Sequence, residues 1–262
     1  DNTIVHLDKY LASDKLTKAD IEKANALKLK AESTIEMMAN PVDVKITSAG
    51  AGINTDENHE YHPSVTADGK IMVFTSRRSD TEGGKRYDLD NDWYEDIYIS
   101  YWSDSLDGWA PAVPIPGAIN TEEHDANLSI SPDGRQLFTF RNDNAGDIFV
   151  SRTRFSRDVT DAVAAGSPDA SRLMSLSRWS KAYSLGKNVN SGYFDSNASV
   201  TADGKTIYFI SERPKGKGNG DIWMSKANST TSWQPAVNLL DLNTIEDEKG
   251  VFIAADNKTL FF

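Results

Sequence analysis

The sequence TADGK at residues 66–70 decides the fold, because near-copies of it return along the chain. The copies are SPDGR at 131–135, TADGK at 201–205 and ADNK at 255–258. After each copy comes a short run rich in β-branched and aromatic residues: KIMVFTS at 70–76, QLFTF at 136–140, TIYFIS at 206–211 and TLFF at 259–262. The Asp-Gly or Asp-Asn pair supplies the positive φ angle that a tight hairpin requires, so each copy predicts two antiparallel strands.

Three further elements recur in a fixed order around each hairpin. Each copy opens with Ile-Asn-Thr or a close variant, at 53–55, 119–121, 189–191 and 242–244. An Asp-Ile-aromatic-x-Ser segment follows the hairpin at 96–100, 147–151 and 221–225, and Trp-x-Pro stands at 109–111 and 233–235. Self-similarity on this scale indicates a repeat architecture, and four antiparallel strands per repeat form the blade of a β-propeller.

The predicted fold class is therefore mainly β, a β-propeller of four-stranded antiparallel blades with three full copies and part of a fourth. The copies start near residues 53, 119, 189 and 242. An open ring leaves unpaired strand edges, so we expect further copies beyond Phe262. Two long insertions interrupt the copies, at 80–94 and at about 157–178, and long loops in a compact repeat are usually functional or disordered.

Residues 1–41 have a different pattern, which predicts a helical hairpin. From Ile21 to Met38 apolar residues recur at steps of three and four, the spacing of one helix face. Thr17 and Asp20 form a capping-box-like start, and Asn40-Pro41 ends the helix because a residue before proline is pushed out of the helical region. We therefore expect two domains, a helical hairpin at 1–41 and propeller blades at 42–262.

Composition narrows the classes of function. The chain of 262 residues has 28 Lys and Arg against 39 Asp and Glu, a formal net charge of −11, and an acidic surface repels nucleic acid. Cysteine is absent, which removes disulfides and thiolate chemistry. No run approaches the roughly 18 apolar residues of a spanning helix, so we expect a chain that does not span a membrane.

The repeats resemble the WD-like propeller repeats of the TolB-type family. The likeness lies in the Asn-Thr opening, the Asp-Gly-Lys hairpin, the Phe-x-Ser strand end at 74–76 and 209–211, and Asp-Ile-aromatic-x-Ser. The second copy departs from this pattern, with FRN at 140–142. Helices placed directly before the first copy are similar to those of envelope proteins that join tetratricopeptide helices to a propeller and often to an OmpA-like domain, such as PorE-like proteins of the type IX secretion machinery.

This resemblance implies a periplasmic, outer-membrane-associated scaffold that binds other cell-envelope proteins and has no catalytic residues to carry over. Residues 1–41 would be the end of a tetratricopeptide-like array. Peptidoglycan would be bound through a domain outside this chain, so no residue here is assigned to it.

The densest acidic cluster consists of Asp88, Asp90 and Asp92, followed by Glu95. Alternating carboxylates can surround Ca²⁺, although the EF-hand pattern fails because Trp93 occupies the position of the turn glycine. The alternative is a solvated loop tip. Calcium is the one cofactor that the sequence suggests.

Glu60, between His59 and His62, suggests a metal or acid–base group. Alignment on the hairpins places an acid at this position in every copy: Glu60, Asp125, Asp195 and Glu248. His59 has a counterpart in His124 but not in the third copy. An acid repeated in each copy predicts a structural role, in which it accepts backbone amides or contacts an adjacent blade. We therefore predict no catalytic residues and no enzyme.

Aromatic residues of the first insertion predict a partner contact. Trp93 and Trp102 have no counterparts in the other copies, and with Tyr87 and Tyr94 they would form an aromatic contact surface on the long first loop. Tyr and Trp are enriched at the centres of protein interfaces. The tryptophans at equivalent positions, Trp109, Trp179 and Trp233, are expected to pack between strands or blades.

The sequence supports three hypotheses about function. The leading hypothesis is a non-enzymatic protein-interaction scaffold of the cell envelope. A carbohydrate- or peptidoglycan-binding module is the alternative, since the same loop aromatics suit sugar stacking. A propeller hydrolase is the third, and a glycosidase of this kind would need two carboxylates facing each other across the pore. The acids found here are either repeated or on loops, which argues against this class.

Overall fold

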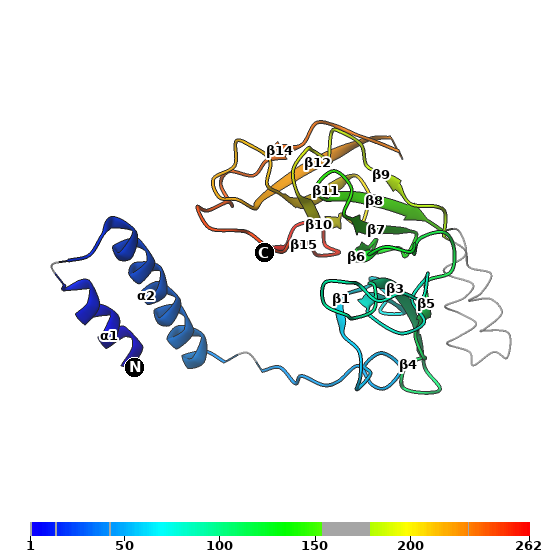
Figure 1. The fold of residues 1–262 in the computed structure, drawn as a ribbon, viewed down its shortest axis with the longest axis horizontal. Coiled ribbons are helices and arrows are strands. Elements are labelled where there is room, and N and C mark those ends of the chain that lie inside the picture. Colours follow the sequence, from blue (N-terminus) through cyan, green and yellow to red (C-terminus); the bar gives the residue numbers. More distant parts are fainter. Residues whose placement is uncertain (1, 14, 42, 154–178, 230) are drawn as a thin grey trace. The chain divides into compact units, whose positions relative to one another are not determined.

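A computed structural model describes the chain except for residues 1, 14, 42, 154–178 and 230 (Figure 1). The second predicted insertion, at about 157–178, lies outside the described residues. The chain divides into two compact units, Asp1–Thr47 and Ser48–Phe262, and each is described by itself. Neither helix in the described part of the chain is long and apolar enough to cross a bilayer.

The first unit holds helices α1 (Asn2–Leu11) and α2 (Lys18–Ala39). The predicted start of α2 is confirmed, since the Thr17 hydroxyl accepts from the Asp20 amide and the Asp20 carboxylate accepts from the Thr17 amide. The predicted end is also confirmed, with Asn40 as the C-cap. The apolar stripe of α2 stays largely exposed, at Ile21, Leu27, Ile35 and Met38.

The second unit contains three blades in the part of the chain that the structure describes (Figure 1). Blade 1 comprises β1 (Glu60–Val65), β2 (Ile71–Ser76), β3 (Asp96–Ser103), β4 (Gly108–Trp109) and β5 (Val113–Pro114). Blade 2 comprises β6 (Ala126–Ile130), β7 (Gln136–Arg141), β8 (Asp147–Arg152) and β9 (Tyr183–Ser184). Blade 3 comprises β10 (Asp195–Val200), β11 (Thr206–Ser211), β12 (Asp221–Ser229), β13 (Ser232–Trp233) and β14 (Val237–Asn238). All strand pairings within the blades are antiparallel, and they are sequential except that β5 pairs with β3 and β14 pairs with β12, so the predicted mainly-β fold of propeller blades is confirmed.

The fourth copy forms a two-stranded hairpin of β15 (Phe252–Ile253) and β16 (Leu260–Phe261). In every copy the turn of the first hairpin has one residue with positive φ, at Gly69, Gly134, Gly204 and Asn257. Glycine adopts this conformation without a Cβ penalty and asparagine tolerates it. The hairpins predicted from the Asp-Gly and Asp-Asn pairs are therefore confirmed.

The outer strand of blades 1 and 3 is divided into two short pieces. Pro111 and Pro235 stand between the pieces, and proline has no N–H to donate to a ladder. In all three blades the last residue of the Asp-Ile-aromatic-x-Ser segment holds the following segment, because its hydroxyl donates to a carbonyl there. The bonds join Ser100 to Ala110, Ser151 to Ser180 and Ser225 to Gln234, at 2.6, 2.5 and 2.5 Å.

Two apolar clusters fill the boundaries between blades. At the boundary of blades 1 and 2, the cluster includes Ile71, Val73, Ile97, Ile99, Tyr101, Ile130, Leu137 and Trp179. At the boundary of blades 2 and 3, it includes Phe138, Ile148, Val150, Ile207, Phe209 and Trp233. Fully burying each large apolar side chain contributes about 1.5–3 kcal/mol. The predicted packing role of the repeated tryptophans is confirmed, with Trp109 half-buried against a third cluster on the other face of blade 1.

Candidate functional site

The acid that recurs in each copy has the same partners in three blades. Its carboxylate accepts from the amide and the hydroxyl of the opening Thr or Ser, and from an arginine that follows or ends the second strand. The acid–arginine pairs are Glu60 with Arg78, Asp125 with Arg141 and Asp195 with Arg213, at 3.1, 2.7 and 2.7 Å. Asp125 and Asp195 are fully buried. The structural role predicted for this acid is confirmed.

The arginine also joins two other elements of its blade. Its guanidinium donates to the carbonyl of the opening residue, Ile53, Ile119 or Val189. It also lies over the aromatic ring of the Asp-Ile-aromatic segment, at 4.6 Å from Tyr98, 5.2 Å from Phe149 and 5.0 Å from Trp223. A guanidinium over an aromatic face is attracted by the ring quadrupole. The repeated aromatic position is thereby explained.

Sequence reasoning missed these arginines. Arg78 and Arg213 stand two residues after the Ser of the Phe-x-Ser strand end, a recurrence that the printed sequence contains. In blade 2 the arginine comes earlier, because Arg141 pairs with Asp147 in the register where Ser76 and Ser211 pair with Asp96 and Asp221. This shift explains why the second copy has FRN at 140–142 in place of the Phe-x-Ser strand end of the other copies.

The opening asparagine binds each copy to the one before it. Its side-chain amide accepts from the backbone N–H and donates to the carbonyl of the Ile in the preceding Asp-Ile-aromatic segment. The pairs are Asn120 with Ile97, Asn190 with Ile148 and Asn243 with Ile222, at 2.8–3.1 Å. The amide thus replaces a strand partner for a buried peptide group. His59 and His62 are exposed and take no part in this network.

The first insertion lies against the opening loop of blade 2; residues 80–95 are called the strap below. The Lys85 ammonium is 2.6 Å from the Glu122 carboxylate, and the Asp125 amide donates to the Glu95 carbonyl at 2.9 Å. The His124 ring of blade 2 contacts two rings of the strap, 4.7 Å from Tyr87 and 4.6 Å from Tyr94, which are 5.5 Å from each other.

The structure brings together three of the four predicted contact aromatics. Tyr87 and Tyr94 hold His124, while Trp93 is partly exposed and stacks on Arg86 at 4.3 Å. Trp102 is separate, because it pairs with Trp109 near the opposite end of β3 from the strap. From Asp96 to Trp102 the extended strand advances roughly 20 Å, at about 3.3 Å per residue.

The acids of the predicted calcium cluster have protein partners or face solvent. Arg77 forms a two-bond pair with Asp90, at 2.7 and 2.9 Å, and lies 3.5 Å from Asp92. The bond with Arg77 lowers the pKa of the Asp90 carboxyl to about 2. Glu95 accepts from the Tyr61 hydroxyl and lies 3.1 Å from His124 Nδ1. Asp88 is exposed.

Within the described residues, no three His, Asp or Glu side chains are grouped as a metal site. Calcium binding stays a prediction, which a calcium titration followed by melting temperature would test.

The Asp that begins each third strand accepts from the loop before it. Asp96 accepts from the Glu82 amide at 2.7 Å and Asp221 from the Lys217 amide at 2.8 Å. Asp96 is fully buried, and one of its oxygens has no partner among the described residues. Burial raises the pKa of Asp96 to about 7, and the Asp125 carboxylate adds to the shift.

No protein-family model matches the sequence, and no curated protein matches it. Among solved structures, TolB from Acinetobacter baumannii is similar at 16% identity and a TM-score of 0.44, over 76% of this chain and 36% of that one. A protein assigned as TolB in Agrobacterium tumefaciens is similar at 14% identity and a TM-score of 0.44, over 78% and 57%.

The periplasmic gluconolactonase PpgL from Pseudomonas aeruginosa is also similar, at 14% identity and a TM-score of 0.35, over 67% of this chain and 43% of that one. The chain therefore spans between about one third and three fifths of the length of these proteins. The similar structures include both an enzyme and proteins that bear the name TolB.

Removal of one network arginine should destabilise the second unit strongly. Arg213→Met leaves the fully buried Asp195 carboxylate without its cation, and breaking a buried pair from one side costs about 3–5 kcal/mol. Urea denaturation measures the loss. Arg135→Met is the control, since Arg135 is exposed and surface changes stay within about 0.5 kcal/mol. Equal effects of the two variants would contradict the assigned role.

The titration of Asp96 should appear as a pH-dependent stability. Its pKa is about 7 in the folded state against 3.8 for the free side chain. The folded state holds this proton more tightly, so the unfolding free energy falls as pH rises between these values, by on the order of a few kcal/mol. Asp96→Asn keeps the acceptor for Glu82 and removes the titration.

The melting temperature of Asp96→Asn, relative to the unaltered protein, should therefore rise from acidic to mildly alkaline pH. Asp107→Asn is the control, because Asp107 is exposed. A constant difference across the pH range for Asp96→Asn would refute the assignment.

Proposed function

We propose that this chain is part of a non-enzymatic protein-interaction scaffold of the cell envelope. The observation that carries the proposal is that the repeated polar residues are hydrogen-bonded within the fold. The acid, the arginine, the asparagine and the serine of the repeats bind one another or the backbone. Groups already engaged in this way are poorly placed to serve as nucleophile, acid or base. Features present in a single copy are then the best candidates for function.

The strap is such a feature, and its outer side has the chemistry of a protein contact. Leu89 is 82% exposed, and Trp93 is partly exposed beside Arg86. Trp, Tyr and Arg dominate the binding energy of protein interfaces. Tyr87 and Tyr94 anchor the strap to His124 of blade 2, so the strap loses less entropy on binding.

The compartment and the partners rest on the sequence resemblance. A helical hairpin before TolB-type repeats supports a periplasmic, outer-membrane-associated protein of a secretion or related complex, in which the helices belong to a tetratricopeptide-like array. Its partners would be other cell-envelope proteins. Contact with peptidoglycan would come from an OmpA-like domain outside this chain.

A carbohydrate-binding role for the strap is less well supported. Sugar rings stack on an open aromatic face, whereas Trp93 has the Arg86 guanidinium 4.3 Å from its ring. A propeller glycosidase would require two free acids that face one another, and the buried acids Asp125 and Asp195 are paired with arginine.

We expect Trp93→Ala to abolish capture of an envelope partner without lowering the melting temperature by more than a few degrees. The truncation removes an interface anchor, which typically costs about 2 kcal/mol or more of binding free energy. A photo-crosslinker at position 89, in intact protein mixed with envelope extract, would report the contact by mass spectrometry.

Trp102→Ala is the matched control, since it is the other single-copy tryptophan of the same blade and lies at the opposite end of β3. Loss of the crosslink in both variants, or in neither, would count against the strap as the contact. Hydrolysis of a glycan or peptide by the unaltered protein would count against a non-enzymatic scaffold.

A further inference from the structure

The boundary between blades 2 and 3 lacks a hydrogen bond that the other boundaries have. The Ala67 amide, in the hairpin turn of blade 1, donates to the Pro132 carbonyl of blade 2 at 3.0 Å. The Ala202 amide, in the turn of blade 3, donates to the Asn257 side chain of the fourth copy at 2.6 Å. The equivalent residue in blade 2 is Pro132, which has no N–H. The two turns at this boundary therefore remain unjoined.

The facing side chains also differ at this boundary. In blade 1, Ile71 and Tyr101 pair across β2 and β3 and are buried in the apolar cluster against blade 2. In blade 2, the same register positions hold Gln136 and Arg152. Polar side chains thus stand where the preceding boundary is sealed by an isoleucine and a tyrosine.

The third difference is that the lysine of the hairpin turn loses an acidic partner on the third strand. In blade 1, the Lys70 ammonium pairs with Asp104 at 2.8 Å. Lys205 is the equivalent lysine of blade 3, and the register of β11 with β12 places Ser229 at the position of Asp104. Among the described residues, Lys205 forms no ion pair. Hydrogen bonding within the same turn lowers the pKa of the Asp203 carboxyl, and the charge of Lys205 adds to this shift, but in the described part of the chain Lys205 has no second acid of the kind that Asp104 provides in blade 1.

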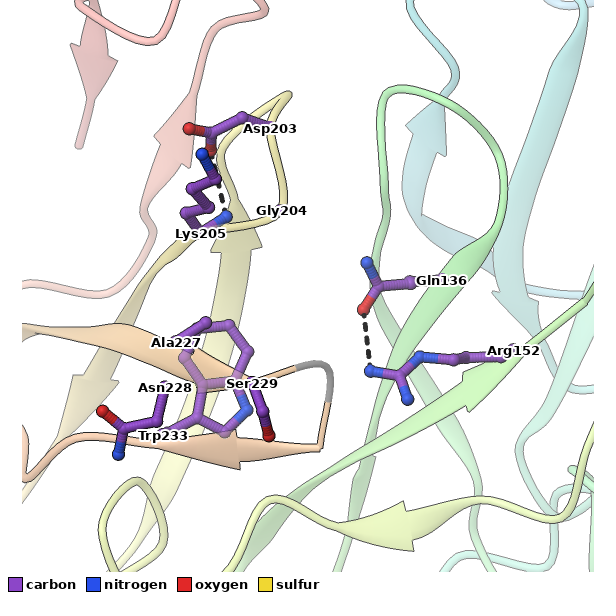
Figure 2. Close-up of a pocket in the computed structure, with 9 residues that line it drawn as sticks. All are labelled: Gln136, Arg152, Asp203, Gly204, Lys205, Ala227, Asn228, Ser229 and Trp233. Carbon is purple, nitrogen blue, oxygen red and sulfur yellow. Dashed lines mark hydrogen bonds between the residues drawn. The ribbon is translucent and has the colours of Figure 1, made fainter.

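These three differences between the boundaries meet at one cleft, shown in Figure 2. Its volume is about 380 Å³, within the roughly 300–1,000 Å³ of small-ligand sites. Gln136 and Arg152 form one wall, and Lys205, Asn228, Ser229 and Trp233 form the other (Figure 2). Arg152 donates to Gln136 at 3.4 Å and lies over the Tyr183 ring, so its position is fixed.

The polar part of the lining consists mainly of hydrogen-bond donors. Lys205 carries positive charge on one wall, in a protein of net charge −11. The acid at the rim, Asp203, already accepts from the Thr201 hydroxyl and the Lys205 amide through one oxygen. Side-chain amides offer both donors and acceptors, as the hydroxyl groups of a polyol require.

We propose that this cleft binds a small sugar acid, a polyhydroxylated molecule with one carboxylate. The carboxylate replaces the missing Asp104-type counter-ion of Lys205. The hydroxyl groups of the ligand bind the side-chain amides of Gln136 and Asn228, because the Ser229 hydroxyl is already bonded to the Ser232 hydroxyl at 2.8 Å and accepts from the Thr231 amide. Trp233 is almost fully buried, so it closes the floor of the cleft and offers no face for stacking.

The test is titration of the intact chain with glucuronate, glucose, acetate and inorganic phosphate at up to millimolar concentration, followed by saturation-transfer NMR. We expect glucuronate to bind, and glucose and acetate to bind at least tenfold more weakly, since a charge-assisted hydrogen bond contributes about 1.5–3 kcal/mol. Lys205→Met should weaken glucuronate binding by about tenfold or more. Ser229→Asp should do the same while keeping the lysine, because it installs the counter-ion of blade 1.

Lys258→Met is the matched control, since Lys258 holds the same hairpin position in the fourth copy, and it should leave binding unchanged. The proposal is overturned if glucuronate does not bind, or if glucose binds equally well. It is also overturned if phosphate alone binds, which would indicate a simple oxyanion site. Unchanged glucuronate binding in both Lys205→Met and Ser229→Asp, with unaltered melting temperatures, would place any binding elsewhere.

Discussion

Each blade depends on a carboxylate that is removed from water and must therefore receive a full set of donors. An ionised carboxylate in an apolar interior is unfavourable unless it is paired and hydrogen-bonded. Asp195 obtains two donors from Ser191 and one from Arg213. The same arginine holds the carbonyl that opens the blade and lies on the aromatic ring of the third strand. One ionic group thus fixes three segments that are far apart in sequence.

This dependence separates what the sequence could predict from what it could not. The hairpins were predictable because the turn residues Gly69, Gly134 and Gly204 need a positive φ, and that requirement is local. The role of Glu60 was predictable because its recurrence in every copy marks it as structural. The partner arginine was not, since Arg141 reaches Asp125 from a strand position two residues earlier than Arg78 reaches Glu60. A guanidinium on a long side chain satisfies the same geometry from different places, so its spacing is not preserved.

The strap illustrates a second limit. Its aromatic residues were visible as unusual, but a sequence does not show that Tyr87 and Tyr94 contact a histidine of the next blade. Trp102 shared their uniqueness and lies at the other end of its strand. Uniqueness therefore identifies residues that the repeat does not require, whereas only the register of β3 decides which of them share a surface.

A repeat protein carries its own internal control, because each boundary between blades can be compared with the next. Ile71, Tyr101 and Asp104 show what a boundary needs in order to be closed and neutral. The boundary of blades 2 and 3 keeps the acid, the arginine and the asparagine of the hydrogen-bond network. It differs from the preceding boundary only at positions outside this network. Because Pro132, Gln136, Arg152 and Ser229 are separate substitutions that converge on one cleft, drift at unrelated surface positions is a weaker explanation than a single site with one chemistry.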